Sequence, residues 1–384
     1  MIDILFFERT LADLKKFAFK ISKELKQIDG AITIGAVAVE MPGKGDENVM
    51  DAFVNRRDIK DIDAFLKKHE VKVMVFTQTR IPDMEFILHC KKLRIKTIMI
   101  QEGVMFDGMN INDVSAKNAF AILGYLPKVF EYFGIVSDMC KYDNRSFFTV
   151  WKHVLQEKKN VTLKLAKEFS KHLICDYIFT MGEFWEDYYL TKHGYKKEQI
   201  RLIGDHDLDG FKPTGENEDA ICYIANVLVE DGTVKKRDFD AFLAAFAESV
   251  DKDTKLYIKL HPRSNKDLYG IFKNHNVEFI RTGTLPSANV YVGHRSALLG
   301  RALYESDSLI IWRFTCEEVC FYEQYATAIC TKPEELKTAI AGIDIHTHTN
   351  KKLETISKVY WNNPEGSMRC AAKLINDYKN NKTI

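Results

Sequence analysis

Short apolar runs alternate with amphipathic, helix-period segments along almost the whole sequence, and this alternation constrains the fold more than any single motif. In the first half, apolar runs and helix-period segments follow one another at residues 2–7, 11–28, 31–39, 61–69, 71–78, 83–93 and 96–101. Strands that alternate with helices are joined by crossovers, which place the strands parallel and the helices on both faces of the sheet. The predicted fold class is therefore α/β.

The alternation breaks at the polar stretch DHDLDGFKPTGENEDA, residues 205–220, and then restarts. A chain of 384 residues is too long for one compact core and suits two domains of ordinary size. We predict two facing, doubly wound, Rossmann-like domains, with ligands bound in a cleft between them, beyond the carboxyl ends of the strands. The predicted segments are an N-terminal domain at 1–205, a linker at 206–218, a C-terminal domain at 219–345 and a helical tail at 346–384.

The first twelve residues of that polar stretch match the calcium-loop pattern D-x-[DN]-x-[DN]-G-x₅-E, from Asp205 to Glu216. Such a loop lies between two helices, whereas the segment that precedes Asp205 is predicted to be a strand. The eighth and ninth positions are Lys212 and Pro213, and aspartate, glycine and proline are also typical of a linker. We therefore interpret the stretch as an interdomain linker and predict no metal site, although calcium binding by this loop stays open.

The segment LYIKLHPRSN, residues 256–265, contains the most informative candidate site. A predicted strand ends at His261, Pro262 fixes the turn that follows, and a helix begins near Ser264. An imidazole, the Arg263 guanidinium, a hydroxyl and free helix N–H groups at the carboxyl end of a strand suit a phosphate group. The alternative interpretation is a histidine that caps a turn and binds no ligand.

A second strand-to-helix junction follows in NVYVGHRSALLGRALYE, residues 289–305. Gly293 makes the turn, Ser296 is placed to cap the next helix, and His294 and Arg295 add donors for an anion. An ordinary cap beside a solvated arginine explains the same residues. Two helix N-termini at one edge of a sheet favour a nucleotide phosphate site more than either junction does alone.

Carboxylates follow predicted strands in both halves of the chain. Glu102 comes directly after the strand KTIMIQ and is placed to act as a general base toward the cleft. The pair Glu230–Asp231, before Gly232, follows the first strand of the second half, so Asp231 is a competing catalytic candidate. A loop carboxylate in water is the alternative interpretation for Glu102.

Composition and missing motifs exclude several classes of protein. The net charge of +1 argues against a nucleic-acid partner, and GxxxxGK[ST], GxSxG, HExxH and an early GxGxxG are absent. The eight cysteines form no CxxC, which indicates reduced thiols rather than a disulfide frame. The N-terminal residues lack the features of a signal peptide and no apolar run has the length of a membrane span, so we expect a cytoplasmic protein.

The segment WKHVLQEKKNVTLKLAKEFSKHL, residues 151–173, is basic and amphipathic. Such a helix is compatible with peripheral contact to the inner membrane or with an anionic acceptor. A solvated helix face has the same pattern, so both interpretations stay open.

Together these segments resemble the bacterial sialyltransferases and polysialyltransferases of the GT-B type. More loosely, they resemble the capsule Kdo transferases and the teichoic-acid glycerophosphotransferases. The resemblance rests on an acidic motif followed by glycine, an HP motif and a serine motif on two α/β domains. It covers most of the chain in outline and is best in the second domain, where strand-KLHP-helix precedes strand-GHRS-helix.

The resemblance implies a role for each matching residue. His261 would bind the donor phosphate and assist departure of cytidine monophosphate, Lys259 and Pro262 would shape the nucleotide pocket, and Ser296 would hold phosphate oxygens. Glu102 would deprotonate the acceptor hydroxyl. No cofactor or metal is implied, because a nucleotide monophosphate that leaves requires stabilisation of an anion.

Three positions depart from the pattern of these families. Gln101 stands where the acidic motif has its first acid, and Ala297 stands where the serine motif has its second hydroxyl. The glycerophosphotransferases would have histidine-glycine in place of Glu102-Gly103. These departures concern the particular sugar and acceptor more than the superfamily.

The predicted function is a glycosyltransferase that moves sialic acid or a related ulosonic acid from a CMP-activated donor to a surface-glycan or glycolipid acceptor, such as capsule or lipopolysaccharide. One alternative is a CDP-glycerol glycerophosphotransferase. Another is a UDP-GlcNAc 2-epimerase-like enzyme, which should have more acids around the serine helix. A third is a non-catalytic protein that binds a nucleotide sugar.

Overall fold

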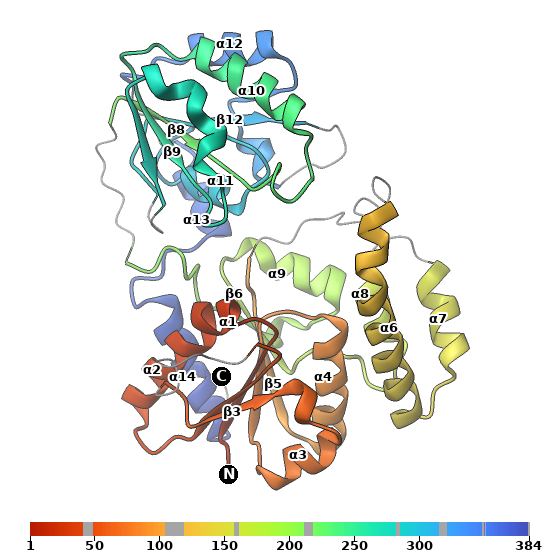
Figure 1. Ribbon diagram of the computed structural model, residues 1–384. Coiled ribbons are helices and arrows are strands. Elements are labelled where there is room, and N and C mark those ends of the chain that lie inside the picture. The colour runs from red at the N-terminus through yellow and green to blue at the C-terminus, as the bar shows by residue number, and fades with distance from the viewer. Residues whose placement is uncertain are drawn as a thin grey trace. The chain divides into compact units, whose positions relative to one another are not determined.

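The structure, a computed structural model, describes residues 1–40, 49–103, 119–156, 161–210, 218–281, 285–314, 321–347, 349 and 351–382 (Figure 1). These residues form two compact units. The first unit comprises Met1–Gly103, Asp107–Gly210 and Trp361–Ile384, and the second comprises Phe211–Tyr360. Residues 211–217, in the predicted linker, lie outside the described residues.

The first unit is built on a seven-stranded parallel sheet. Its strands run in the order β3 (Ala52–Asn55), β2 (Ile34–Ala38), β1 (Ile4–Glu8), β4 (Val73–Phe76), β5 (Lys96–Ile100), β6 (Tyr177–Thr180) and β7 (Ile200–Leu202). Every residue of β1, β2 and β4 is buried, as expected for parallel strands that have helices on both faces.

Helices pack on both faces of this sheet. Alternate side chains of β1 point to opposite faces, so Phe6 packs in the core beneath α2, whereas the Phe7 ring lies 4.7 Å from that of Phe86 on α4. The helical elements of the first unit are α1 (Leu11–Asp13), the π-helical turn η1 (Leu14–Ala18), α2 (Phe19–Ile28), η2 (Arg56–Asp58), α3 (Ile62–Lys68), α4 (Ile81–Leu93), α6 (Ala119–Tyr142), α7 (Phe147–Gln156), α8 (Val161–Lys167), α9 (Phe184–Tyr188), η3 (Tyr189–His193), η4 (Lys197–Gln199) and α14 (Ser367–Lys379).

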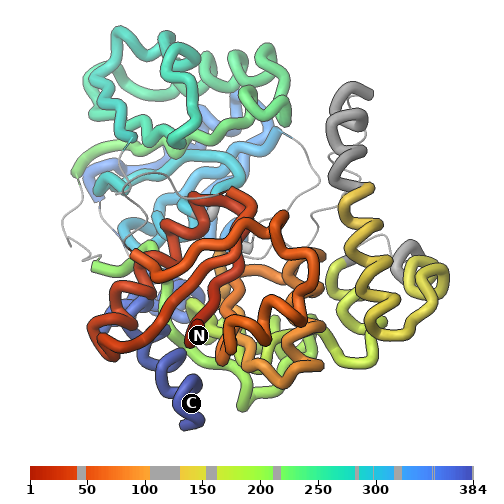
Figure 2. The backbone as a smooth tube through the Cα atoms, turned by 60° about the horizontal axis from the view of Figure 1, so that its bottom comes forward, coloured from red at the N-terminus to blue at the C-terminus, as the bar shows by residue number. Residues whose placement is uncertain are grey.

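The helix α14 completes the first unit although it follows the second unit in the sequence. It packs beside α2, as Figure 2 shows, and Lys379 Nζ lies 2.8 Å from a carboxylate oxygen of Asp29. The carboxylate of Asp209 accepts hydrogen bonds from the backbone N–H and the hydroxyl of Ser367, at 2.6 and 2.9 Å. The stretch that follows β7 therefore caps the N-terminus of α14.

The second unit contains a six-stranded parallel sheet. Its strands run in the order β10 (Val277–Ile280), β9 (Lys255–Lys259), β8 (Ala220–Ile224), β11 (Val290–Gly293), β12 (Ser308–Trp312) and β13 (Ala328–Cys330). Its helical elements are α10 (Lys236–Ser249), η5 (Lys266–Asn274), α11 (Ala297–Ala302), η6 (Phe321–Tyr325), α12 (Pro333–Ala341) and α13 (Leu353–Val359). The predicted α/β class, with two Rossmann-like domains, is confirmed.

Three local predictions differ from the structure. The first strand of the second half ends at Ile224 rather than directly before Glu230–Asp231, because the Asn226 amide donates to the Arg295 carbonyl at 2.7 Å and its Oδ1 accepts from the next backbone N–H, so the chain turns. The helix predicted to begin near Ser264 is the 3₁₀ helix η5, which contains a kink at Tyr269. The half-buried edge strand β3 was missed by the sequence analysis.

A helical segment, α6 to α8, lies between β5 and β6 in the chain. Residues 104–118 and 157–160, which adjoin these helices, lie outside the described residues. Within the described part of the chain, neither α6 nor any other helix is long and apolar enough to cross a membrane.

We predict that Gly204→Ala destabilises the first unit. Gly204 has φ +101°, and a Cβ at this position would lie 2.7 Å from Asn363 Cβ and 2.9 Å from the Trp361 carbonyl oxygen. We expect a loss of about 1–3 kcal/mol beyond the backbone strain alone, measured as the free energy of unfolding in urea. Gly210→Ala is the matched control, since Gly210 has φ +79° and open space around it. Equal losses in the two variants would contradict the close approach of the C-terminal segment.

Candidate functional site

Each sheet has one point at which the strand order reverses. This point lies between β1 and β4 in the first unit and between β8 and β11 in the second. Ligands of doubly wound sheets bind beyond the carboxyl ends of the strands at such a point. The candidate site residues that follow β9 and β11 lie at this edge of the second sheet, on either side of β8.

The loop after β9, which we call the HP loop, comprises His261 to Asn265. Its turn is closed by a hydrogen bond from Ser264 N to the His261 carbonyl at 2.9 Å, and the Ser264 side chain is buried. Arg281, which follows β10, donates to the carbonyls of Pro262 and Ser264 at 3.2 and 3.0 Å. The main chain of the HP loop is therefore fixed by a side chain from the neighbouring strand.

The acidic pair after β8 also binds the HP loop. The Asp231 carboxylate accepts hydrogen bonds from both terminal nitrogens of Arg263, at 2.8 and 3.0 Å, in a bidentate pair. Glu230 Oε1 accepts from the backbone N–H of Asn265 at 2.8 Å. Gly232, at φ +69°, makes the turn that follows the two acids. The structure thus brings Asp231 and Arg263 together. Both Asp231 carboxylate oxygens bind this arginine, and the role of Asp231 as a catalytic base stays a prediction.

His261 presents a defined hydrogen-bond donor. Its Nδ1 accepts from the backbone N–H of Arg263 at 3.1 Å, so the neutral ring carries its proton on Nε2. Partial burial, together with the positive charge of Arg263, lowers the pKa of His261 below its usual value. The imidazole is therefore neutral at pH 7, and its Nε2–H can donate to a phosphate oxygen.

Lys259 contributes a buried cation to the same edge. It pairs with Ile224 of β8, which in turn pairs with Gly293 of β11, so the Lys259 and Ile224 side chains point to the sheet face on which α11 packs over Gly293. Burial lowers the pKa of the Lys259 ammonium. A Cβ on Gly293 would lie 2.9 Å from Leu299 of α11, so glycine is needed here for close packing of the helix.

The junction after β11 has its predicted cap but differs from the prediction at His294. Ser296 Oγ accepts from Leu298 N at 3.3 Å and caps α11, while Ser296 N donates to the Tyr322 hydroxyl at 2.7 Å. Arg295 follows the predicted turn, and its carbonyl oxygen accepts from the side-chain amide of Asn226, just beyond β8. The donor-binding roles of Arg295 and Ser296 stay predictions.

The His294 ring is buried, 2% exposed, rather than presented at the edge of the sheet. Its Nδ1 donates to the Trp312 carbonyl at 3.2 Å, so its Nε2 accepts from the Tyr223 hydroxyl at 2.8 Å. Burial lowers the pKa of His294 to about 4, and the ring is neutral. Because both nitrogens bind protein groups, this placement supports a structural role and does not support the predicted contact with a donor.

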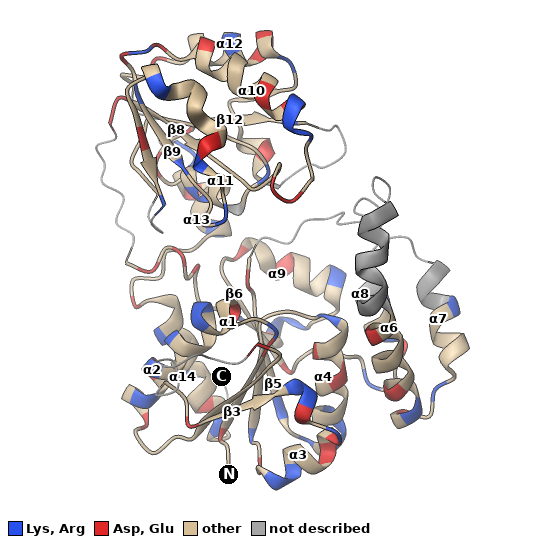
Figure 3. Cartoon of the chain, viewed as in Figure 1, with Lys and Arg blue, Asp and Glu red and all other residues tan. Residues whose placement is uncertain are grey.

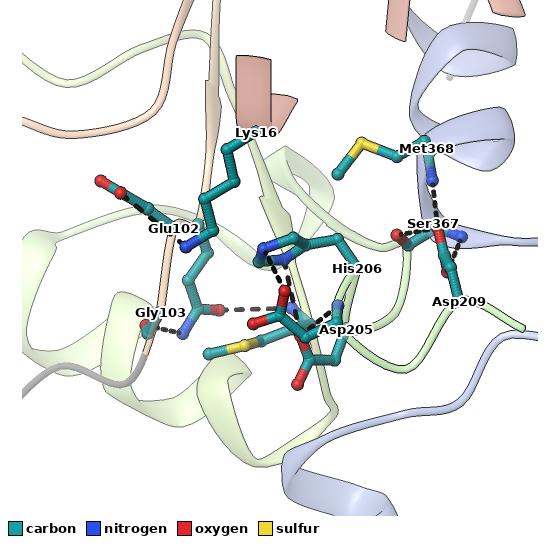
Figure 4. A network of polar contacts seen from close by, with 11 residues as sticks. Lys16, Glu102, Gly103, Asp205, His206, Asp209, Ser367 and Met368 are labelled. Carbon is teal, nitrogen blue, oxygen red and sulfur yellow. Dashed lines mark hydrogen bonds and ion pairs between the residues drawn. The ribbon is translucent and has the colours of Figure 1, made fainter. Parts of the chain in front are cut away.

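In the first unit, Glu102 lies just beyond β5, as predicted (Figure 4). Its carboxylate accepts from the Gln78 amide, which follows β4, and lies 4.0 Å from Lys16 Nζ. The Gln101 side chain accepts from Met181 N at 3.3 Å and so joins the ends of β5 and β6. Glu102 therefore stands on a braced loop near the reversal of strand order, with its side chain 20% exposed.

The calcium-loop motif is divided between two roles in the structure. Asp209 caps α14, whereas Asp205, His206 and Asp207 group at the end of β7. His206 Nε2 lies 3.1 Å from Asp207 Oδ1, and Nδ1 lies 3.5 Å from Asp205 Oδ1. Among the described residues, this trio alone has side-chain atoms spaced closely enough to bind a metal ion. Ion pairing of a histidine with two carboxylates explains the same arrangement. Residues 211–216, the rest of the motif, lie outside the described residues.

Sequence reasoning missed a buried carboxyl group at the reversal point itself. Glu8 ends β1 and is 1% exposed, with Oε2 at 3.6 Å from Arg80 Nη2 and the Thr77 hydroxyl beside it. Arg80 is held by Asp83 through contacts of 2.8 and 3.0 Å. Burial raises the pKa of Glu8 to about 8, against the effects of Thr77 and Arg80. An acid directly after the apolar run ILFF was the only available signal in the sequence.

We predict that Glu8→Gln removes a distinct pH dependence of stability. The pKa of Glu8 is 4.5 in the unfolded chain and about 8 in the folded protein. At a pH between these two values, the folded protein holds a proton on Glu8 that the unfolded chain has lost. Stability therefore falls as the pH rises through this window, by about 1.4 kcal/mol per pH unit at most. In urea titrations from pH 5 to 9, the variant should gain stability relative to wild type as the pH rises. Glu183→Gln, at an exposed position, is the control and should keep the pH profile of the wild type. A pH profile of Glu8→Gln that runs parallel to that of the wild type would contradict the prediction.

Comparison with known proteins gives a fold. No protein-family model and no curated protein matches the sequence. Solved structures do match over nearly the whole chain. MnaA of S. aureus, in a co-structure with UDP, aligns with a TM-score of 0.53 at 11% identity, over 99% of this chain and 97% of its own.

Two further structures match over a similar extent. UGT71G1 of Medicago truncatula, complexed with UDP-glucose, has a TM-score of 0.55 at 10% identity and covers 98% of both chains. UDP-GlcNAc 2-epimerase of Neisseria meningitidis, bound to UDP-GlcNAc, has a TM-score of 0.52 at 12% identity, over 98% of this chain and 99% of its own. These three structures contain UDP, UDP-GlcNAc or UDP-glucose, and the chain shares their GT-B type of fold with two Rossmann-like domains.

Proposed function

We propose that this protein is a glycosyltransferase that uses a nucleotide-activated sugar, and that the donor is CMP-sialic acid or a related ulosonic acid. The acceptor would be a glycan or glycolipid of the cell surface. The second unit would bind the nucleotide, and the first unit would supply the base that activates the acceptor hydroxyl.

The observation that carries this proposal is the construction of the HP loop. Three side chains, Glu230, Asp231 and Arg281, hold its main chain and Arg263, so that the His261 Nε2–H is positioned before any ligand binds. Groups that are fixed in advance need no reorganisation when negative charge develops on a leaving group. Such a loop suits a phosphate whose charge increases during the reaction.

The proposed chemistry balances without a redox partner. The bond between the anomeric carbon and the phosphate oxygen breaks, and cytidine monophosphate leaves with the electron pair. His261 donates a hydrogen bond to that phosphate, and Lys259 adds a positive charge on the same sheet edge. Glu102 accepts the proton of the acceptor hydroxyl as its oxygen forms the new glycosidic bond.

An epimerase that acts on UDP-GlcNAc fits the fold about as well as a transferase does, because two of the compared structures contain UDP or UDP-GlcNAc. The sequence of α11 and the residues after it distinguishes a transferase from an epimerase. No acid follows Ser296 before Glu305, whereas an epimerase-like enzyme is expected to have several acids around this helix. This difference favours the transferase. CDP-glycerol transfer and binding without catalysis are the remaining alternatives.

We predict that CMP or CDP raises the melting temperature of the wild type and that His261→Ala loses this response. A ligand at one hundred times its dissociation constant adds about 2.7 kcal/mol of stability, which thermal shift detects readily. CMP, CDP, UDP and GDP are compared in parallel. His346→Ala is the control, since His346 binds Asp219 at the opposite, amino end of β8.

Each outcome of this comparison is informative. A response to UDP alone would move the epimerase ahead, and C2 inversion of UDP-GlcNAc, followed by proton NMR, would establish it. A response to no nucleotide, or an equal response in His261→Ala, would overturn the proposed site.

We predict that Glu102→Gln and Asp231→Asn fail in different ways. If Glu102 is the base, its amide variant should keep the nucleotide-induced thermal shift and lose turnover by about a hundredfold or more. Asp231→Asn should weaken the nucleotide response, because the HP loop loses the partner of Arg263. Glu8→Gln is measured alongside as a third carboxyl candidate. Loss of turnover in Asp231→Asn with binding intact would instead make Asp231 the base.

A further inference from the structure

The helices α6 and α7 carry a set of exposed and half-buried aromatic side chains that the proposed reaction does not use. We call this set the aromatic ridge; it comprises Phe130, Phe133, Phe147, Phe148 and Trp151. Phe148 is 83% exposed, Phe130 is 70% exposed and Phe133 is 39% exposed. These are among the most exposed large apolar side chains of the described residues.

The ridge is continuous rather than scattered. The Phe133 ring stacks on Trp151 at 4.6 Å and lies 6.0 Å from Phe147, which in turn contacts Phe148 at 5.8 Å. Phe130 lies one helical turn before Phe133 and so neighbours it on the same face of α6. Contiguous exposed apolar surface on a soluble unit marks a site of interaction, whereas isolated exposed side chains do not.

The opposite face of α6 is committed to the first unit. Val136, Met139 and Cys140 are buried, and the Tyr142 hydroxyl donates to the Asp63 carboxylate at 2.9 Å. The Tyr142 ring also stacks on His89 of α4, with centroids 3.9 Å apart. Because the helix is anchored through this face, the ridge is not available to the core of the unit and stays presented to the surroundings.

Cations accompany the ridge. Lys141 is 76% exposed and pairs with Asp138 at 3.3 Å, and Arg145 and Lys152 are also exposed. Figure 3 shows charges of both signs on α6 and Lys or Arg on α7. From residue 130 to residue 172 the sequence has eight Lys or Arg and five Asp or Glu, whereas the whole chain carries only +1. Apolar aromatic rings beside an excess of Lys and Arg are the combination that binds the interface of an anionic bilayer.

We propose that the aromatic ridge docks the protein on an anionic lipid surface, with Phe130 and Phe148 entering the interface and the neighbouring cations contacting lipid headgroups. A second copy of the chain would bring the same excess of positive charge against itself, whereas an anionic bilayer has the opposite sign. The rings of Phe130, Phe133 and Phe148 also have no polar group with which to select a protein or sugar partner. This proposal does not rest on the proposed function.

The test uses the full-length protein and sedimented vesicles of phosphatidylcholine, alone or mixed with phosphatidylglycerol. We expect the wild type to bind the anionic vesicles and to be released by high salt. The double variant Phe130→Ser/Phe148→Ser should partition at least about tenfold more weakly, because each ring contributes apolar area to the interface. The exposed control Ile271→Ser, which lies on the second unit and is 44% exposed in wild type, should bind like wild type.

A second readout checks that the ridge enters the bilayer. Trp151 lies against Phe133, so vesicles with brominated acyl chains should quench the total tryptophan fluorescence of the wild type more than that of a Trp151→Phe variant, which keeps the other three tryptophans. Both Ser substitutions are at exposed positions, and unchanged melting temperatures confirm that the variants are folded. Wild type that stays in the supernatant, or a double variant that binds equally, would overturn the proposal. So would self-association of the wild type that the double variant abolishes, because the ridge would then be an interface between copies.

Discussion

Parallel pairing is the constraint on which the arrangement of this protein depends. Within each sheet every strand runs parallel to its neighbours, so the residues that follow the strands collect at one edge of that sheet although they are far apart in sequence. Asp231, Arg263 and Arg281 come from three separate crossovers and still meet around a single loop. The HP loop is thus fixed by the topology of the sheet as much as by its own residues, and Pro262 determines only the start of its turn.

The two units place their acidic groups in different surroundings. Asp231 lies in an exposed pair with Arg263, where solvent screens the charges and the pair orients a loop more than it stabilises the fold. Glu8 is enclosed beside Arg80 and Asp83, and burial shifts its pKa toward the physiological range. Perturbed groups of this kind often occur at functional sites, although structural networks also produce them. Glu8 therefore belongs among the carboxyl groups that deserve separate tests in the first unit.

Much of the architecture could be read from the sequence, because alternating strands and helices have a periodic signal. The HP loop could also be read, since a histidine and a proline that follow an apolar run mark the end of a strand. The burial of His294 could not, because it depends on Tyr223 and on the Trp312 carbonyl, which only the folded sheet brings together. Glu8 has no partner at a fixed spacing, and the acids from Asp205 onward matched a calcium pattern that the fold uses in part to cap a helix.

The return of α14 to the first unit has a consequence for how the chain is made. The first unit lacks one of its core helices until Ser367–Lys379 has been synthesised, whereas all of Phe211–Tyr360 precedes this helix. During synthesis the second unit can fold while the first still exposes the apolar surface that Met368, Ala371 and Ile375 will cover. The first unit can therefore complete its core only after all residues of the second unit have been made.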